Sequence, residues 1–225
     1  MQTPGEFLRS FIPRFVDDRV LLWFYDLIRW VRLPLQTADS ARLEQNRAAY
    51  LQHLPSIRKA GGYVEDQQNY GDMTYGRTLL KDTGCEILAV YNALNTLDSS
   101  SCPSLPDMIL DFEADGMVLS GRFGTSPRAL LRYLIKKGYC AELITDSSCF
   151  DTLGQRYSSL ILTLYNNRED ITEEIHTIHI SRSPQGFTAH NASSQGPVPT
   201  VSQLIRMQNH GKGRGICLIG INTRD

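Results

Sequence analysis

The chain has 225 residues, enough for one generous domain or for a domain with an extension. Lys and Arg number 23 against 24 Asp and Glu, so the nearly neutral chain offers no electrostatic attraction to nucleic acid or to an anionic membrane. The five cysteines are scattered and contain no CxxC pair, which disfavours a disulfide framework or a zinc site and favours a cytoplasmic protein with reduced thiols. We therefore expect neither a metal ion nor another cofactor.

Residues 1–60 are predicted to form a helical extension, with helices near 5–12, 17–33 and 39–54, the last of them stopped by Pro55. The second helix carries a stripe of large apolar side chains, formed by Val20, Trp23, Phe24, Leu27, Trp30 and Val31 and widened by Leu21, Tyr25 and Ile28. We expect the stripe to dock on the main core, since the aspartates of this helix disfavour an anionic membrane. The alternative is a contact between this aromatic helix and a partner. No apolar run is long enough to cross a bilayer, so no transmembrane segment is expected.

Residues 61–225 are predicted to form the main domain. A turn-rich stretch at 61–78 leads into a first apolar helix, and two further helices follow, the second of them opening at Ser126-Pro127. The spacing of apolar residues then changes to the period of two that is typical of strands. Strands are expected at 139–144, 159–165, 175–182, 187–191 and 215–222, and a short helix near 200–209. Helices followed by a mainly antiparallel sheet indicate an α+β fold.

A cysteine at the start of the apolar helix is the first candidate for chemistry. The turn Asp82-Thr83-Gly84 delivers Cys85 to the first helical turn. Backbone N–H groups lack partners there, and the helix dipole favours negative charge. The position predicts a thiol that is biased toward the thiolate, the nucleophilic form.

A cysteine nucleophile needs a base, and the base needs a residue that orients it. In the strand at 175–182, alternation places His176 with Ile178 and Ile180, the face expected to pack toward the Cys85 helix. His179 is then expected in an outer layer or in solvent. Asn191 ends the neighbouring strand, where its side-chain oxygen is expected to accept the imidazole N–H of His176. The predicted catalytic residues are therefore Cys85, His176 and Asn191.

Three segments, "DTGCEILAVYNAL", "GTSPRALLRYLIKKGY" and the pair "HTIHI" with "FTAHN", resemble the bacterial C39-like peptidase family of the papain-like superfamily. The resemblance follows the order of elements over residues 69–222. It implies a papain-like catalytic domain at 61–225 and a cysteine-type peptidase or amide hydrolase. It also implies a peptide or protein substrate and a thioester intermediate.

One position departs from the family. A glutamine six residues before the cysteine usually completes the oxyanion hole, and here that position is Leu79, which cannot donate. Loss of such a donor costs about 100- to 1,000-fold in rate. Gln67, Gln68, Asn69 and Thr78 are candidate substitutes. The alternatives are an inactive papain-like domain that binds peptide, and a transferase that passes the thioester to an amine. The N-terminal helices either cover Cys85, as an autoinhibitory segment, or pack behind it.

Overall fold

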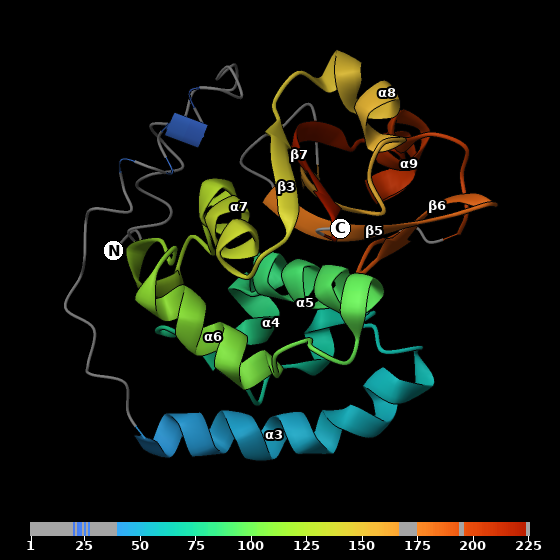
Figure 1. The fold of residues 1–225 in the computed structure, drawn as a ribbon. Coiled ribbons are helices and arrows are strands. Elements are labelled where there is room, and N and C mark those ends of the chain that lie inside the picture. Colours follow the sequence, from blue (N-terminus) through green and yellow to red (C-terminus); the bar gives the residue numbers. More distant parts are fainter. Residues whose placement is uncertain are drawn as a thin grey trace.

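The computed structural model describes residues 40–166, 175–193 and 196–223, together with Val20, Leu22, Trp23, Tyr25 and Leu27. The helix expected near 5–12 lies outside these residues, whereas the five residues described between 20 and 27 are helical. In the described part, helices come first and an antiparallel sheet follows, so the α+β class is confirmed (Figure 1).

The helices follow the predicted order. Their bounds are α3 Ser40–Lys59, α4 Leu80–Thr83, α5 Cys85–Asp98, α6 Leu105–Ala114, α7 Pro127–Lys136, α8 Phe150–Gly154 and α9 Val201–Met207. The prediction that Pro55 ends the third helix is wrong, because α3 continues through it to Lys59. Beyond the proline, Ile57 is buried in the main core, and this burial favours the added helical turn at the expense of one backbone hydrogen bond.

Five antiparallel strands form the main sheet in the order β3-β7-β4-β5-β6. Their bounds are β3 Cys140–Ile144, β4 Ser159–Tyr165, β5 Ile175–Ser183, β6 Gly186–His190 and β7 Arg214–Asn222. A separate two-stranded hairpin, β1 (Thr74–Tyr75) and β2 (Thr78–Leu79), precedes α4. All five strands of the main sheet fall close to their predicted positions.

Both faces of the main sheet are covered, which overturns the predicted orientation of β5. Ile178 and Ile180 pack in a core with Leu204 of α9 and Phe150 of α8, on the face away from α5. His179 points to the α5 face, where its Nε2 lies 3.3 Å from the hydroxyl of Thr96. Because α8 and α9 cover the second face, apolar residues occur at both parities, and alternation alone could not identify the α5 side.

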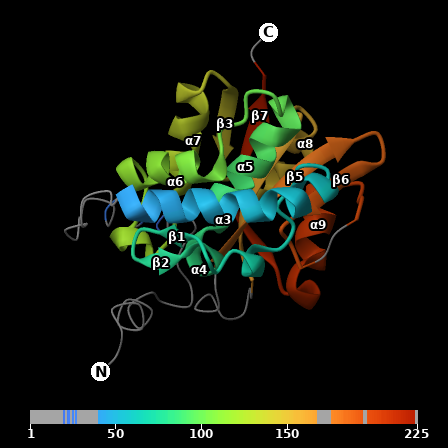
Figure 2. The same cartoon turned by 90° about the horizontal axis from the view of Figure 1, so that it is seen from below.

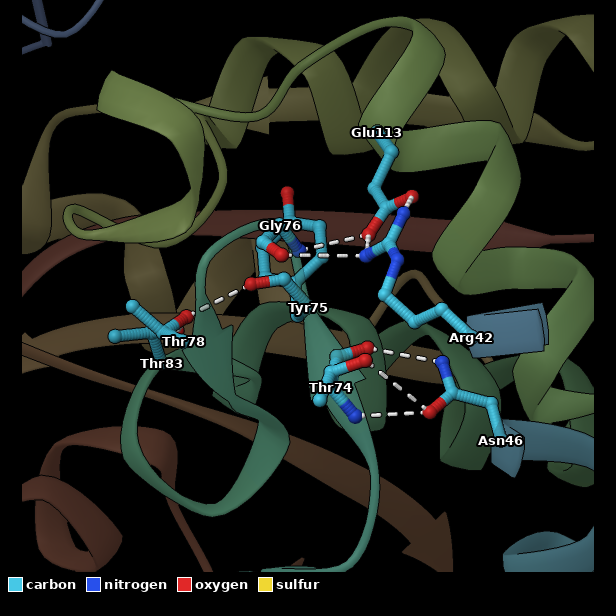
Figure 3. Close-up of polar contacts among 8 residues, drawn as sticks. All are labelled: Arg42, Asn46, Thr74, Tyr75, Gly76, Thr78, Thr83 and Glu113. Carbon is cyan, nitrogen blue, oxygen red and sulfur yellow. Dashed lines mark hydrogen bonds and ion pairs between the residues drawn. The ribbon is translucent and has the colours of Figure 1, made fainter. Parts of the chain in front are cut away.

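Helix α3 crosses the outer side of α5 and α6 and is tied to the hairpin that leads to Cys85 (Figures 2 and 3). The side chain of Asn46 pairs with the backbone of Thr74 through two hydrogen bonds of 2.9 Å. Arg42 of α3 and Glu113 of α6 form an ion pair that also binds both backbone groups of Gly76. This network fixes the hairpin from outside and so positions the short helix α4 just before the cysteine.

Of the predicted docking stripe, Tyr25 at its widened edge is buried, whereas the described residues at its centre are not. Leu22 and Tyr25 are buried, in a cluster with Val118, Tyr165, Ile216 and Cys217. Val20, Trp23 and Leu27, which belong to the predicted docking stripe, are at least half exposed. Side chains at 22 and 25 are about one helical turn apart and lie on the opposite side of the helix from Val20, Trp23 and Leu27. Among the described residues, no helix has the length and apolarity to cross a membrane.

Candidate functional site

A cavity of about 700 Å³ opens where the start of α5 meets the first residues of β5 and the end of β6. Cys85, His176 and Asn191 all line this cavity, although 91 residues separate the cysteine from the histidine in sequence. The remaining wall comes from the segment before the β1–β2 hairpin, from α4 and from the loop that precedes α7. The structure therefore brings the three predicted residues to one cavity, although the reason given for choosing His176 is wrong, because Ile178 and Ile180 pack away from α5.

Cys85 is placed by a tight junction between α4 and α5. Gly84 separates the two helices, and a Cβ at this position would lie only 2.6 Å from the backbone oxygen of Leu80. The next helix begins at Cys85 itself, and its first ten residues are buried. The thiol is thus held on a rigid element, which is an advantage for a nucleophile that must meet a carbonyl carbon.

The protonation of Cys85 differs from the expectation. Burial raises the pKa of the thiol well above its ordinary value, and the charge of Glu86 raises it further. The backbone N–H of Thr177, next to His176, acts in the opposite direction by favouring the thiolate. Burial outweighs the helix N-terminus here, because only 7% of the residue is exposed. The resting site therefore holds a neutral thiol, which needs a base to remove its proton.

Glu86 is a buried carboxyl beside the nucleophile, and the sequence reading did not identify it. Burial raises the pKa of Glu86 to about 7, against hydrogen bonds from backbone N–H groups and from Cys85. Its Oε2 has no hydrogen-bond partner among the described residues. A Cβ at Gly124, whose φ is +61°, would lie 2.6 and 2.7 Å from its two oxygens, so glycine is required there.

His176 and Asn191 are in contact, but through the backbone. The Nε2 atom of His176 lies 2.8 Å from the carbonyl oxygen of Asn191. A carbonyl oxygen can only accept, so in the neutral imidazole Nε2 carries the proton and Nδ1 carries the lone pair. This tautomer is the one that a general base requires.

The side chain of Asn191, expected to orient His176, makes other contacts. Its Oδ1 accepts the backbone N–H of Gln67 at 2.9 Å, and its Nδ2 donates to the Oε1 of Gln67 at 3.2 Å. Asn191 has a φ of +55°, a left-handed conformation that asparagine adopts more readily than most residues. The paired amides hold this conformation and so aim the carbonyl at His176.

The carboxylate of Glu65 binds the backbone of Asn191. Glu65 accepts the backbone N–H of Asn191 at 3.2 Å and contacts the Nδ1 of His190 at 2.7 Å. The Nε2 of His190 lies 2.8 Å from the Ser181 hydroxyl, and the Tyr63 ring stacks on the imidazole at 3.8 Å. Sequence reasoning missed Glu65, because it precedes Asn191 by 126 residues in an irregular segment.

The expected oxyanion hole has no glutamine at position 79. Leu79, the residue at the family's glutamine position, ends β2 and lies outside the cavity lining. Of the four proposed substitutes, Gln67 and Gln68 line the cavity. The amide nitrogen of Gln67 donates to the Lys81 carbonyl at 2.8 Å, whereas that of Gln68 reaches the same oxygen at 3.5 Å. The side chain of Gln68 is exposed and makes the longer of these two contacts.

Tyr25 forms another part of the cavity wall. Its side chain lines the cavity together with Cys85 and Glu86, and only 6% of the residue is exposed. Burial raises the pKa of its phenol well above the ordinary value, with further contributions from the charges of Glu86 and Cys85. The aromatic ring thus takes part in burying the thiol. The sequence placed Tyr25 at the edge of the apolar stripe but did not indicate that it meets Cys85.

The side chains that usually bind metal ions in proteins are those of His, Cys, Asp and Glu. Within the described ranges, no three of these side chains come together in an arrangement that would hold a metal ion. His179 and His190 stack at 5.0 Å between ring centroids, but the Nε2 of His179 contacts the Ser159 hydroxyl at 3.0 Å. These rings therefore serve the packing beneath the site.

Comparisons with known proteins give few matches. No protein-family model matches the chain, and no curated protein matches its sequence. A solved structure that is similar is the peptidase domain of Streptococcus ComA, a bi-functional ABC transporter involved in a quorum-sensing pathway. The two share 12% sequence identity with a TM-score of 0.39, over 62% of this chain and 91% of that domain.

Proposed function

We propose that this chain is a papain-like cysteine peptidase or amide hydrolase in which Cys85 is the nucleophile and His176 the general base. The observation that carries the proposal is the meeting of the two residues in one cavity, with the Nε2 of His176 tied to the Asn191 carbonyl at 2.8 Å. The substrate is a peptide or protein, whose scissile carbonyl enters the cavity above the start of α5.

The reaction begins with a neutral thiol. As Cys85 attacks the carbonyl carbon, its proton passes to the Nδ1 of His176, and the C–S bond forms while the C=O bond opens to an oxyanion. The backbone N–H of Cys85, at the N-terminus of α5, and the side-chain amide of Gln68 stabilise this oxyanion. The imidazolium then protonates the leaving amine, and a thioester remains on Cys85. Water, activated by the same histidine, hydrolyses the thioester and frees the thiol.

The test measures acylation of Cys85 and turnover together. Wild-type protein is incubated with a pool of peptide amides, quenched in acid and examined by intact-mass spectrometry for a covalent acyl group. We expect acylation and peptide release in wild type. In Cys85→Ser and in His176→Ala, the rate of peptide release should fall by at least about 100-fold. Exposed Cys140 provides a matched control, since Cys140→Ser should keep full activity.

Two outcomes would contradict the proposal. Turnover that survives Cys85→Ser would exclude this nucleophile. Peptide that binds equally to wild type and to Cys85→Ala, with no turnover in either, would show a binding domain. Adding a primary amine separates hydrolysis from transfer, because a transferase yields the amide of that amine in place of the free acid.

A further inference from the structure

Glu65 is connected to His176 through the backbone of one residue, Asn191, whose two flanking peptide groups each make one of the contacts. Its carboxylate accepts the N–H of Asn191 at 3.2 Å, and the carbonyl of the same residue contacts the Nε2 of His176 at 2.8 Å. The carboxylate acts on the imidazole in two ways: it orients the backbone of Asn191, and its negative charge acts through space. Both effects favour a proton on Nε2 and a positively charged imidazolium.

The position of Glu65 is over-determined by its neighbours. His190 holds one carboxylate oxygen at 2.7 Å, and His190 is itself fixed between Ser181 and the stacked ring of Tyr63. The side chain of Glu65 is about two-thirds buried, so its charge is only partly screened by solvent. Gln67, two residues along, clamps the Asn191 side chain, so one short segment fixes both the orientation and the field of this residue.

We propose that Glu65 is a positioning residue that acts on His176 through the backbone of Asn191. It supplies the negative charge that the neutral Asn191 side chain lacks and stabilises the imidazolium formed when His176 takes the thiol proton. The inference rests on the proposed function for its catalytic meaning. The electrostatic link between Glu65 and His176 is measurable without any substrate.

Other ionisable groups also line the cavity and bear on the titration of His176. They are Asp66, Lys81, Asp82, Cys85, Glu86 and Arg122. All of them stay unchanged when Glu65 is replaced, so a difference between variants reports on Glu65 and on what it touches.

The experiment follows the imidazole nitrogens of His176 by ¹⁵N NMR across a pH titration. In wild type we expect the tautomer with the proton on Nε2. The Glu65→Gln variant, equal in size but uncharged, should move the titration midpoint of His176 toward acid by about one pH unit. Glu65→Asp, which keeps the charge, should retain most of the wild-type midpoint and serves as second variant. The exposed Glu44 on α3 gives the control, because Glu44→Gln removes one charge far from the site.

The same variants are assayed for peptide release, where Glu65→Gln should lower the rate about tenfold. An unchanged His176 midpoint in a folded Glu65→Gln protein would overturn the inference, even with a lower melting temperature. A shifted midpoint together with turnover that is independent of Cys85 would instead overturn the proposed function and leave the electrostatic link standing.

Discussion

The ionisation of Cys85 depends on two neighbouring residues that act in opposite directions. Glu86 and burial raise the pKa of the thiol, whereas the backbone N–H of Thr177 favours the thiolate. The pKa of Glu86 is itself raised to about 7, so its charge appears only as the pH passes neutrality. The charge of Glu86 therefore destabilises the Cys85 thiolate most strongly in mildly alkaline solution, where thiols ordinarily begin to ionise.

This arrangement predicts that Glu86→Gln makes Cys85 more reactive above neutral pH. At pH 8 the wild-type carboxylate is ionised, and removing its charge should speed iodoacetamide alkylation of Cys85 about three- to tenfold. At pH 5.5 the wild-type Glu86 is protonated and therefore uncharged, as the glutamine of the variant is. The two proteins should then react at the same rate. Alkylation is measured site by site by peptide mapping, with Glu44→Gln as a charge-matched control. A ratio that does not change with pH would contradict the prediction.

At the scale of elements, the helical residues Leu22 and Tyr25 bring the N-terminal segment to the edge of the cavity. Tyr25 lines the cavity with Cys85, and Leu22 is buried in the same cluster as Tyr25. The side of the helical turn that carries Leu22 and Tyr25 therefore faces the protein. The outer face, with Trp23 and Leu27, is at least half exposed. Two buried side chains are a modest anchor, worth about 3 to 6 kcal/mol before the entropy of ordering the turn is subtracted.

Shortening Tyr25 should therefore open the thiol. In the full chain we expect Tyr25→Ala to raise the alkylation rate of Cys85 by about tenfold or more, because solvent and reagent reach the sulfur and burial no longer opposes its ionisation. Trp23→Ala, on the exposed face of the same turn, is the control and should leave the rate unchanged. Equal rates in wild type and Tyr25→Ala would mean that the N-terminal turn packs beside the site without covering it.

The order of elements was predictable from sequence because it depends on local signals. Apolar periodicity located every strand of the main sheet, and Ser104 and Ser126-Pro127 marked the starts of α6 and α7. The orientation of β5 was wrong, since alternation cannot tell which face of a doubly covered sheet meets α5. Contacts between residues far apart in the sequence could not be predicted either. Nothing near Glu65 or Tyr25 in the sequence indicates that they meet Asn191 or Cys85.

At the scale of the whole molecule, two buried groups give the stability opposite dependences on pH. His179 is fully buried, and burial together with His190 lowers its pKa well below the ordinary 6.5. Its contribution is present above pH 6.5 and is lost as the pH falls, because the unfolded chain then binds a proton that the folded chain refuses. Glu86, with a folded pKa of about 7 against 4.5, does the reverse. Its contribution is full in acid and is lost as the pH rises toward 7.

Between pH 4.5 and 6.5 these two contributions change with pH in opposite directions, so single substitutions should expose slopes that the wild type hides. Relative to wild type, the unfolding free energy of Glu86→Gln should rise by about 2 to 3 kcal/mol from pH 5 to pH 8. That of His179→Gln should rise as the pH falls below 6.5, added to a constant loss from broken packing. Urea denaturation at each pH gives both values, and His210→Gln, at an exposed histidine, should track the wild type throughout. Parallel curves for all four proteins would show that neither buried group changes its protonation on unfolding, and that the cavity is better solvated than its geometry implies.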